Sequence, residues 1–166
     1  WLSSRGLGDV YKRQITDNKG ALPLLAPMSE IAGRLAVFEG AYHLKKTCGG
    51  PGSLISGVPG VKPAKVIILG GGMVGTNAAK MAIGVGADVT IFDKSIERLR
   101  YLNDIFGNSA KVLYSEPLEL KSQLVDADLV IGAVLIPGAS APKLIEKSFL
   151  SKMKNNSVLV LSLIHI

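Results

Sequence analysis

The sequence has one cysteine and no long apolar run, and each shortage excludes a class of protein. Cys48 is the only cysteine among 166 residues, so neither an intramolecular disulfide nor a metal cluster of thiolates can form. Apolar segments such as residues 66–69 and 129–136 are far shorter than the roughly 20 residues that cross a bilayer. The first residues also lack the pattern of a signal peptide. We therefore expect a cytoplasmic, globular protein without a metal or a membrane partner.

Aromatic residues are also scarce, at 5%, and they are not interleaved with basic residues. The formal net charge is +6, but Lys and Arg are spread along the chain and form no run. Runs of basic residues with aromatic neighbours mark nucleic-acid grooves, whereas dispersed charges are typical of a solvated surface. We predict no nucleic-acid partner.

The two ends of the sequence are related through their codons. Residues 9–14 can be encoded by GATGTGTATAAGAGACAG, and the reverse complement of this DNA encodes residues 161–166. The element resembles the mosaic end of transposase-based sequencing libraries. We therefore interpret residues 1–14 and 161–166 as non-native, adapter-derived segments and leave them out of the fold prediction. Without their charged side chains the formal net charge falls to +4.

From residue 65 onward, short β-branched segments alternate with longer helical ones, which is typical of a parallel sheet covered by helices. The predicted strands are residues 65–69, 88–93, 111–114 and 128–134, with a fifth strand that begins at Ser157. The predicted helices are residues 74–85, 96–106, 118–125 and 143–152. The expected fold is α/β, a truncated Rossmann-type doubly wound parallel sheet.

A further helix is predicted over residues 29–46, with Ser29 as its N-cap. Small residues on this helix would let another backbone approach closely; they are Ala32, Gly33, Ala36, Gly40 and Ala41. Residues 49–60, which follow, are rich in glycine and proline and are typical of a linker.

A glycine motif follows the first predicted strand and opens the next helix. It reads Gly70-Gly71-Gly72-Met73-Val74-Gly75, a G-x-G-x-x-G pattern. In a dinucleotide-binding turn, Gly70 permits the tight turn, Gly72 lets the pyrophosphate approach the backbone, and Gly75 lets helix and strand pack closely. The phosphates would bind at the helix N-terminus. The alternative is a glycine turn that binds nothing.

Asp93 ends the second predicted strand, 23 positions after Gly70. This is close to the offset of about 20 residues at which an acidic side chain meets the adenosine ribose. The carboxylate favours NAD, because it would repel the 2′-phosphate of NADP. Lys94 and Arg98 leave NADP open, since either could pair with that phosphate if Asp93 turned away. Asp93 could also be an ordinary solvated carboxylate.

Two further segments are weaker candidates for functional residues. Residues 134–139 follow the fourth predicted strand, at the edge where open α/β sheets bind ligands, but these apolar side chains could equally belong to the core. His43 has no acidic or nucleophilic neighbour in the sequence, so we interpret it as a surface or domain contact.

Taken together, residues 22–34, 57–61, 70–79 and 133–138 resemble the alanine dehydrogenases of the alanine dehydrogenase and NAD(P) transhydrogenase alpha-subunit family. The resemblance covers residues 15–160. It implies an NAD-dependent enzyme that interconverts L-alanine with pyruvate and ammonium, usually as a homohexamer. Residues 29–160 would be its NAD-binding domain with a leading interdomain helix, and residues 15–28 a remnant of its catalytic domain.

The resemblance also implies roles for individual residues. Ser29 would contact the cofactor from the interdomain helix, and Met73 and Val74 would lie at the pyrophosphate. Asp93 and Arg98 would hold the adenosine side. The strand edge would contribute Ser115, Val134 and Leu135.

The family's substrate-binding arginine and lysine, and its catalytic histidine and aspartate, have no counterpart in this sequence. His43 does not match the family histidine. We therefore expect no catalytic residue here and no activity from the chain alone. The alternatives are a transhydrogenase alpha subunit and a nucleotide-sensing module without chemistry. Residues 28–30 and 136–138 favour the dehydrogenase over the transhydrogenase, and a sensing module would not need the interdomain helix.

Overall fold

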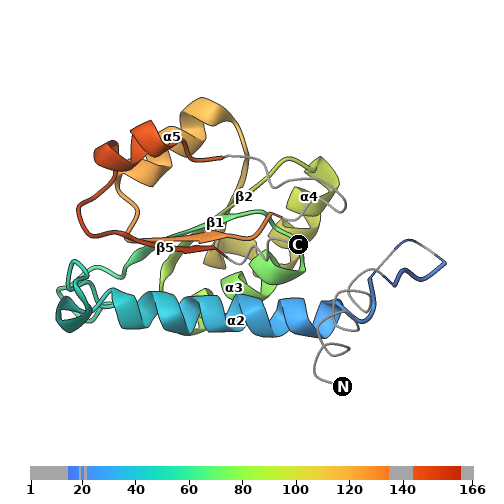
Figure 1. Ribbon diagram of the computed structural model, residues 1–166, viewed down its shortest axis with the longest axis horizontal. Coiled ribbons are helices and arrows are strands. Elements are labelled where there is room, and N and C mark those ends of the chain that lie inside the picture. Colours follow the sequence, from blue (N-terminus) through green and yellow to red (C-terminus); the bar gives the residue numbers. More distant parts are fainter. Residues whose placement is uncertain (1–14, 19, 21, 135–143, 162–166) are drawn as a thin grey trace, which may run out of the picture.

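The computed structural model describes residues 15–18, 20, 22–134 and 144–161. In this part of the chain, a five-stranded parallel sheet lies between two layers of helices (Figure 1). Its α-helices and strands are α2 (Ala26–His43), β1 (Lys65–Leu69), α3 (Met73–Gly84), β2 (Asp88–Asp93), α4 (Ile96–Phe106), β3 (Lys111–Tyr114), α5 (Pro117–Val125), β4 (Leu129–Gly132) and β5 (Val158–Leu161). Short 3-10 helices are η1 (Lys46–Cys48), η2 (Gly107–Ser109) and η3 (Lys147–Lys152). The predicted α/β class is confirmed.

The strands lie in the order β3-β2-β1-β4-β5. The chain moves outward from β1 to β3 and then crosses back to place β4 on the other side of β1. In the register, Leu69 at the end of β1 pairs with Phe92 and with Gly132. The carboxyl ends of these strands therefore lie at one edge, and the gap between β1 and β4 is the switch point at which open α/β sheets bind ligands.

The two faces of the sheet bury alternate residues of β1, as the period of two in a strand requires. Val66 and Ile68 pack against α2, α3 and α4 on one face. Ile67 and Leu69 pack against α5 and η3 on the other. Because both faces are covered, β1 is a continuous apolar run without polar alternation.

Most predicted elements agree with the structure. The bounds of β1, β2, β3 and α4 are those predicted, while α3 and α5 each begin one residue early and β4 is shorter. The predicted helix over residues 143–152 is confirmed only over residues 147–152, where it is the 3-10 helix η3. Glu146 is extended, and the 3-10 helix η3 begins only after it. This bend lets Leu144, Ile145 and Phe149 all pack onto the sheet.

The start of α2 also differs from the prediction. The helix begins at Ala26, so Ser29 lies inside its first turn and is not the N-cap. Pro27 accounts for the earlier start, because a first-turn proline has no N–H that the helix would leave unpaired. The N–H of Ser29 instead donates to the carbonyl of Leu25, at 3.0 Å. The helix ends at His43, short of the predicted Lys46.

The small residues of α2 do allow a close approach, as predicted. A Cβ on Gly33 would lie 2.2 Å from the carbonyl oxygen of Val74, and a Cβ on Gly40 would lie 2.5 Å from a side-chain carbon of Leu129. Both glycines are buried. Helix α2 therefore lies directly on α3 and β4 (Figure 1).

Residues 49–60 have the composition of a linker, but they are packed against the rest of the domain. Gly50 is buried, and a Cβ on it would lie 2.2 Å from the carbonyl oxygen of His43. The hydroxyl of Ser53 donates to Asp128 at 3.0 Å. Asp128 also accepts the backbone N–H of Lys65 at 2.9 Å and pairs with the ammonium of Lys154. One buried carboxylate thus joins this segment to the amino-terminal edge of the sheet.

Burial raises the pKa of Asp128, but hydrogen bonds from Lys154, Lys65 and Ser53 outweigh it and hold the pKa below its ordinary value of 3.8. The ionised group therefore stabilises the fold above the pKa of the unfolded state, and this contribution is lost as the pH falls toward the folded-state pKa. We expect Asp128→Asn to lower the free energy of unfolding by about 2 kcal/mol at neutral pH. Urea titrations should show the difference from wild type shrinking below about pH 4. A difference that does not change with pH would contradict this assignment.

Candidate functional site

A glycine loop connects the end of β1 to the start of α3. Gly70 has a φ of +99°, which side chains rarely adopt, and its N–H donates to the carbonyl of Phe92 at 2.8 Å. A Cβ on Gly70 would lie 2.9 Å from the carbonyl oxygen of Ala133 and 2.9 Å from Cγ2 of Val134. The loop is therefore packed into the switch point between β1 and β4.

Two further glycines of the motif have different surroundings. A Cβ on Gly75 would lie 1.8 Å from the carbonyl oxygen of Gly70, so only glycine lets α3 begin against the loop. A Cβ on Gly72 would meet no atom of the described residues within 4 Å. Gly72 is the N-cap of α3, and no side chain caps the first-turn N–H groups. The space in front of this helix end is therefore open, while its back is closely packed.

Asp93 holds the loop through its carboxylate. One oxygen accepts the N–H of Gly71 at 2.7 Å, and the other accepts the N–H of Ser95 at 2.8 Å. The hydroxyl of Ser95 in turn accepts the N–H of Arg98 at the start of α4. Asp93 is half-buried and is not simply a solvated group at a strand end. It joins the loop after β1 to the turn after β2.

Arg98 reaches from α4 across the same loop. Its Nε donates to the carbonyl of Gly71, and Nη2 donates to the hydroxyl of Thr76 at 2.8 Å. The hydroxyl of Thr76 donates to the same Gly71 carbonyl at 3.1 Å. The guanidinium lies 4.5 Å from the ring centre of Tyr101, within cation–π range. Arg98 therefore clamps the loop to α3 and α4, a structural role that sequence reasoning did not identify.

Other predicted site residues follow the neighbouring strands at the same edge. Ser115 comes directly after β3, and its N–H donates to the carbonyl of Asp93 at 2.9 Å. Val134 is half-buried and lies beside Gly70. The structure thus brings together predicted residues from the ends of β1, β2, β3 and β4. Leu135 and residues 136–138 lie outside the described residues.

The remaining predicted residues lie on the two helices that meet at this edge. Met73 is exposed and Val74 half-buried in the first turn of α3. Ser29 precedes Gly33 by about one helical turn, and Gly33 contacts the backbone of Val74. Ser29 is therefore at the end of α2 that faces the start of α3.

Asn77 is a residue of this region that sequence reasoning missed. It is 4% exposed, donates to the carbonyl of Met73 at 3.0 Å, and accepts a hydrogen bond from Nε of Arg34 at 3.3 Å. It therefore connects α2 to the first turn of α3. A polar residue within the buried stripe of an amphipathic helix was the signal that could have revealed it.

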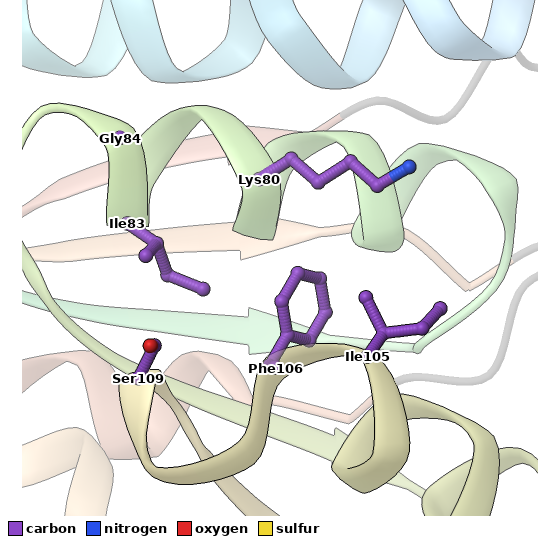
Figure 2. Close-up of a pocket in the computed structure, with 6 residues that line it drawn as sticks. All are labelled: Lys80, Ile83, Gly84, Ile105, Phe106 and Ser109. Atoms are coloured by element: carbon purple, nitrogen blue, oxygen red, sulfur yellow. The ribbon is translucent and has the colours of Figure 1, made fainter.

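A cleft of about 340 Å³ lies elsewhere, between the later turns of α3 and α4 (Figure 2). Its lining residues are Lys80, Ile83, Gly84, Ile105, Phe106 and Ser109. Figure 2 shows Ile83, Ile105 and Phe106 pointing into one gap, with the chain of Lys80 alongside. None of these residues belongs to the glycine loop, so the cleft is separate from the candidate site.

The described residues contain no group of three or more His, Cys, Asp or Glu side chains placed to hold a metal ion. Among the same residues, no helix has both the length and the apolar character needed to span a membrane.

Residues 36–161 match the family model described as alanine dehydrogenase/PNT, C-terminal domain. The chain belongs to this family. A relative named alanine dehydrogenase from Halomonas elongata is 56% identical over 159 residues, which make up 96% of this chain and 43% of that protein. The alanine dehydrogenase of Bacillus subtilis is 51% identical over 159 residues, again 96% of this chain and 42% of that protein. The chain thus spans less than half the length of these relatives.

Solved structures of the alanine dehydrogenase/PNT family agree with the sequence comparison. An L-alanine dehydrogenase superposes with a TM-score of 0.88 at 52% identity, covering 90% of this chain and 42% of that one. A transhydrogenase from Sinorhizobium meliloti gives a TM-score of 0.68 at 27% identity, over 81% of this chain and 38% of that one. The predicted resemblance to alanine dehydrogenases is confirmed, and the transhydrogenase is the more distant relative of the two.

The different surroundings of Gly75 and Gly72 give a matched pair of substitutions. Gly75→Ala should lower the free energy of unfolding by about 3 kcal/mol, because its methyl group would force α3 away from the Gly70 carbonyl. Gly72→Ala should cost less than about 1 kcal/mol, since it meets only open space at an N-cap. Urea unfolding followed by circular dichroism would measure both. An equal loss of unfolding free energy in the two variants would contradict the close contact between Gly75 and the Gly70 carbonyl.

Proposed function

We propose that this chain is the NAD-binding domain of an alanine dehydrogenase, which converts L-alanine, NAD⁺ and water to pyruvate, ammonium, NADH and a proton. The open space in front of Gly72 at the start of α3 carries this proposal. Its support is the identity of 56% and 51% to two alanine dehydrogenases, against 27% to a transhydrogenase structure.

The residues at the helix end fit the pyrophosphate of a dinucleotide. The first N–H groups of α3 have no side-chain cap, and a helix N-terminus favours an anion through these groups and through its dipole. Gly72 leaves room for the phosphates to approach, and Met73 and Val74 form the first turn against which they would rest. Gly70 and Gly75 keep the loop and the helix in place around that turn.

The adenosine side of the cofactor would be held at the end of β2. Each oxygen of Asp93 accepts one backbone N–H, and a carboxylate has about four lone-pair sites, so acceptor capacity remains for the ribose hydroxyls. A 2′-phosphate at that position would be repelled by the carboxylate. Arg98 lies beside Asp93 on the adenosine side, but its Nε and Nη2 already donate to the loop and to Thr76, which favours NAD over NADP.

Ser115 follows β3, next to Asp93, so it would line the cofactor on the adenosine side. The nicotinamide side would lie beyond β1, along Val134 at the end of β4, with Leu135 continuing this wall and Ser29 approaching from α2. When bound, the cofactor supplies the acceptor for a hydride from the α-carbon of alanine. This chain's residues would bind the cofactor, orient it and repel NADP. We expect the family's substrate-binding and proton-transferring groups in the part of the relatives that this chain does not span.

Several properties of the whole enzyme follow by resemblance and are part of the proposal. The enzyme would be a cytoplasmic homo-oligomer, with six subunits as its family state, and L-alanine and pyruvate would be its substrates. Residues 15–28 would come from its catalytic domain. The chain alone would bind NADH without oxidising alanine.

Cofactor binding at the helix end can be tested with Gly72→Val. We expect this variant to weaken NADH binding at least about tenfold, roughly 1.4 kcal/mol, because the side chain would fill the space for the pyrophosphate. NADH fluorescence would measure binding, and circular dichroism would report folding. Gly84→Val is the control, since a Cβ there also meets open space but lies at the far end of α3. Equal binding by the two variants would show that the loop is only a turn.

The preference for NADH over NADPH tests the role of Asp93. We expect Asp93→Asn to reduce the ratio of the two affinities about tenfold, because the charge that repels the 2′-phosphate is removed while one acceptor oxygen remains. Asp88→Asn removes the same charge at the other end of β2, where the carboxylate pairs with Lys111, and should leave the ratio unchanged. Calorimetry would measure both ratios. If Asp93→Asn keeps the wild-type preference for NADH over NADPH, another group must distinguish the two cofactors.

A further inference from the structure

Thr76 is a buried polar residue in the first turn of α3, with 5% of its surface exposed. Its hydroxyl donates to the carbonyl of Gly71 at 3.1 Å and accepts a hydrogen bond from Nη2 of Arg98 at 2.8 Å. Its backbone N–H donates to the carbonyl of Gly72 at 2.9 Å. This one residue therefore binds two successive carbonyl groups of the glycine loop.

The bond from Arg98 determines which group the Thr76 hydroxyl donates to. A guanidinium group has only donors, whereas a hydroxyl has one proton to donate and lone pairs that accept. The hydroxyl must therefore accept from Arg98, and its proton is left for the carbonyl of Gly71. The same carbonyl also accepts a hydrogen bond from Nε of Arg98, so both of its lone pairs are used. The oxygen of Gly71 is thus held by one side chain from α3 and one from α4.

The peptide between Gly71 and Gly72 needs such a restraint, because residues without a Cβ allow a wide range of backbone dihedrals. In a planar trans peptide, the C=O and the following N–H point in opposite directions. While the Gly71 oxygen is held, the N–H of Gly72 therefore points the other way, and it forms no hydrogen bond to another described residue. Resting on the proposed function, we propose that Thr76 is a positioning residue that directs this N–H toward the pyrophosphate of the cofactor.

Reversal of the Gly71–Gly72 peptide would place a carbonyl oxygen where the N–H group is. The partial negative charge of that oxygen repels a phosphate, whereas a backbone N–H at a helix start attracts it. Loss of the Thr76 hydroxyl should therefore weaken the binding of ligands that place phosphates at this point. The adenosine part should be unaffected, because the two hydrogen bonds that hold the Asp93 carboxylate do not involve Thr76.

Titrations of the 166-residue chain with ADP and with adenosine, followed by NMR, test this role. Thr76→Val keeps the shape of the side chain and removes the hydroxyl. We expect it to weaken ADP binding about tenfold, the effect of one misdirected charge-assisted hydrogen bond, and to change adenosine binding less than about twofold. Thr76→Ser keeps the hydroxyl and should bind ADP as the wild type does. Thr90→Val is the matched control, because the Thr90 hydroxyl is buried in β2 without a hydrogen-bond partner among the described residues.

The amide resonance of Gly72 in the same titrations gives a readout that a purely structural role would not change. Saturation with ADP should shift this resonance in the wild type, Thr76→Ser and Thr90→Val, and should shift it less in Thr76→Val. Wild-type ADP affinity in Thr76→Val, or an equal loss of ADP and adenosine binding, would overturn the positioning role. The same holds if Thr76→Ser does not restore ADP binding. A wild-type chain that does not bind ADP would overturn the proposed function as well, so the two failures can be told apart.

Discussion

The close contact between Gly75 and the carbonyl of Gly70 is the constraint on which the site depends. It leaves no room for a side chain, since a Cβ on Gly75 would lie 1.8 Å from that oxygen. Because of it, α3 begins immediately after β1 and points its uncapped end toward the switch point of the sheet. The contacts of Asp93, Arg98 and Thr76 all converge on Gly71, the residue between the turn at Gly70 and the open N-cap at Gly72. They stabilise a loop whose position the glycine contact already determines.

Much of the fold could be predicted because, in the central part of the chain, the local residue patterns agree with the elements that form. A strand buried on both faces is a continuous apolar run, so β1 and β2 were predicted at their observed bounds. Helix α4 has a serine N-cap and a clear amphipathic pattern, and its bounds were also predicted. The glycine motif then located the candidate site, since its spacing reflects backbone geometry rather than side-chain chemistry.

The parts that sequence reasoning missed depend on partners distant along the chain. Ser29 is a good N-cap by type, but the first turn is set by Pro27 and starts earlier. Residues 49–60 have the composition of a linker, yet Ser53 in this segment donates to Asp128, which is 75 positions further along the chain. Arg98 could be assigned to the cofactor by resemblance, but only the folded chain shows that two of its nitrogens bind the loop itself. The local sequence pattern cannot predict such contacts, because the two partners are brought together only by the fold.

Helix α2 and the glycine loop are mechanically coupled by the contact between Gly33 and the carbonyl of Val74. A Cβ at Gly33 would lie 2.2 Å from that oxygen, so backbone rests on backbone without a flexible side chain between them. Arg34 and Asn77 add a hydrogen bond beside this contact. Because of this contact, α2 cannot rotate about its axis or slide along α3 without displacing the first turn of α3. A change in the tilt of α2 would therefore be transmitted to the first turn of α3 through backbone contact alone.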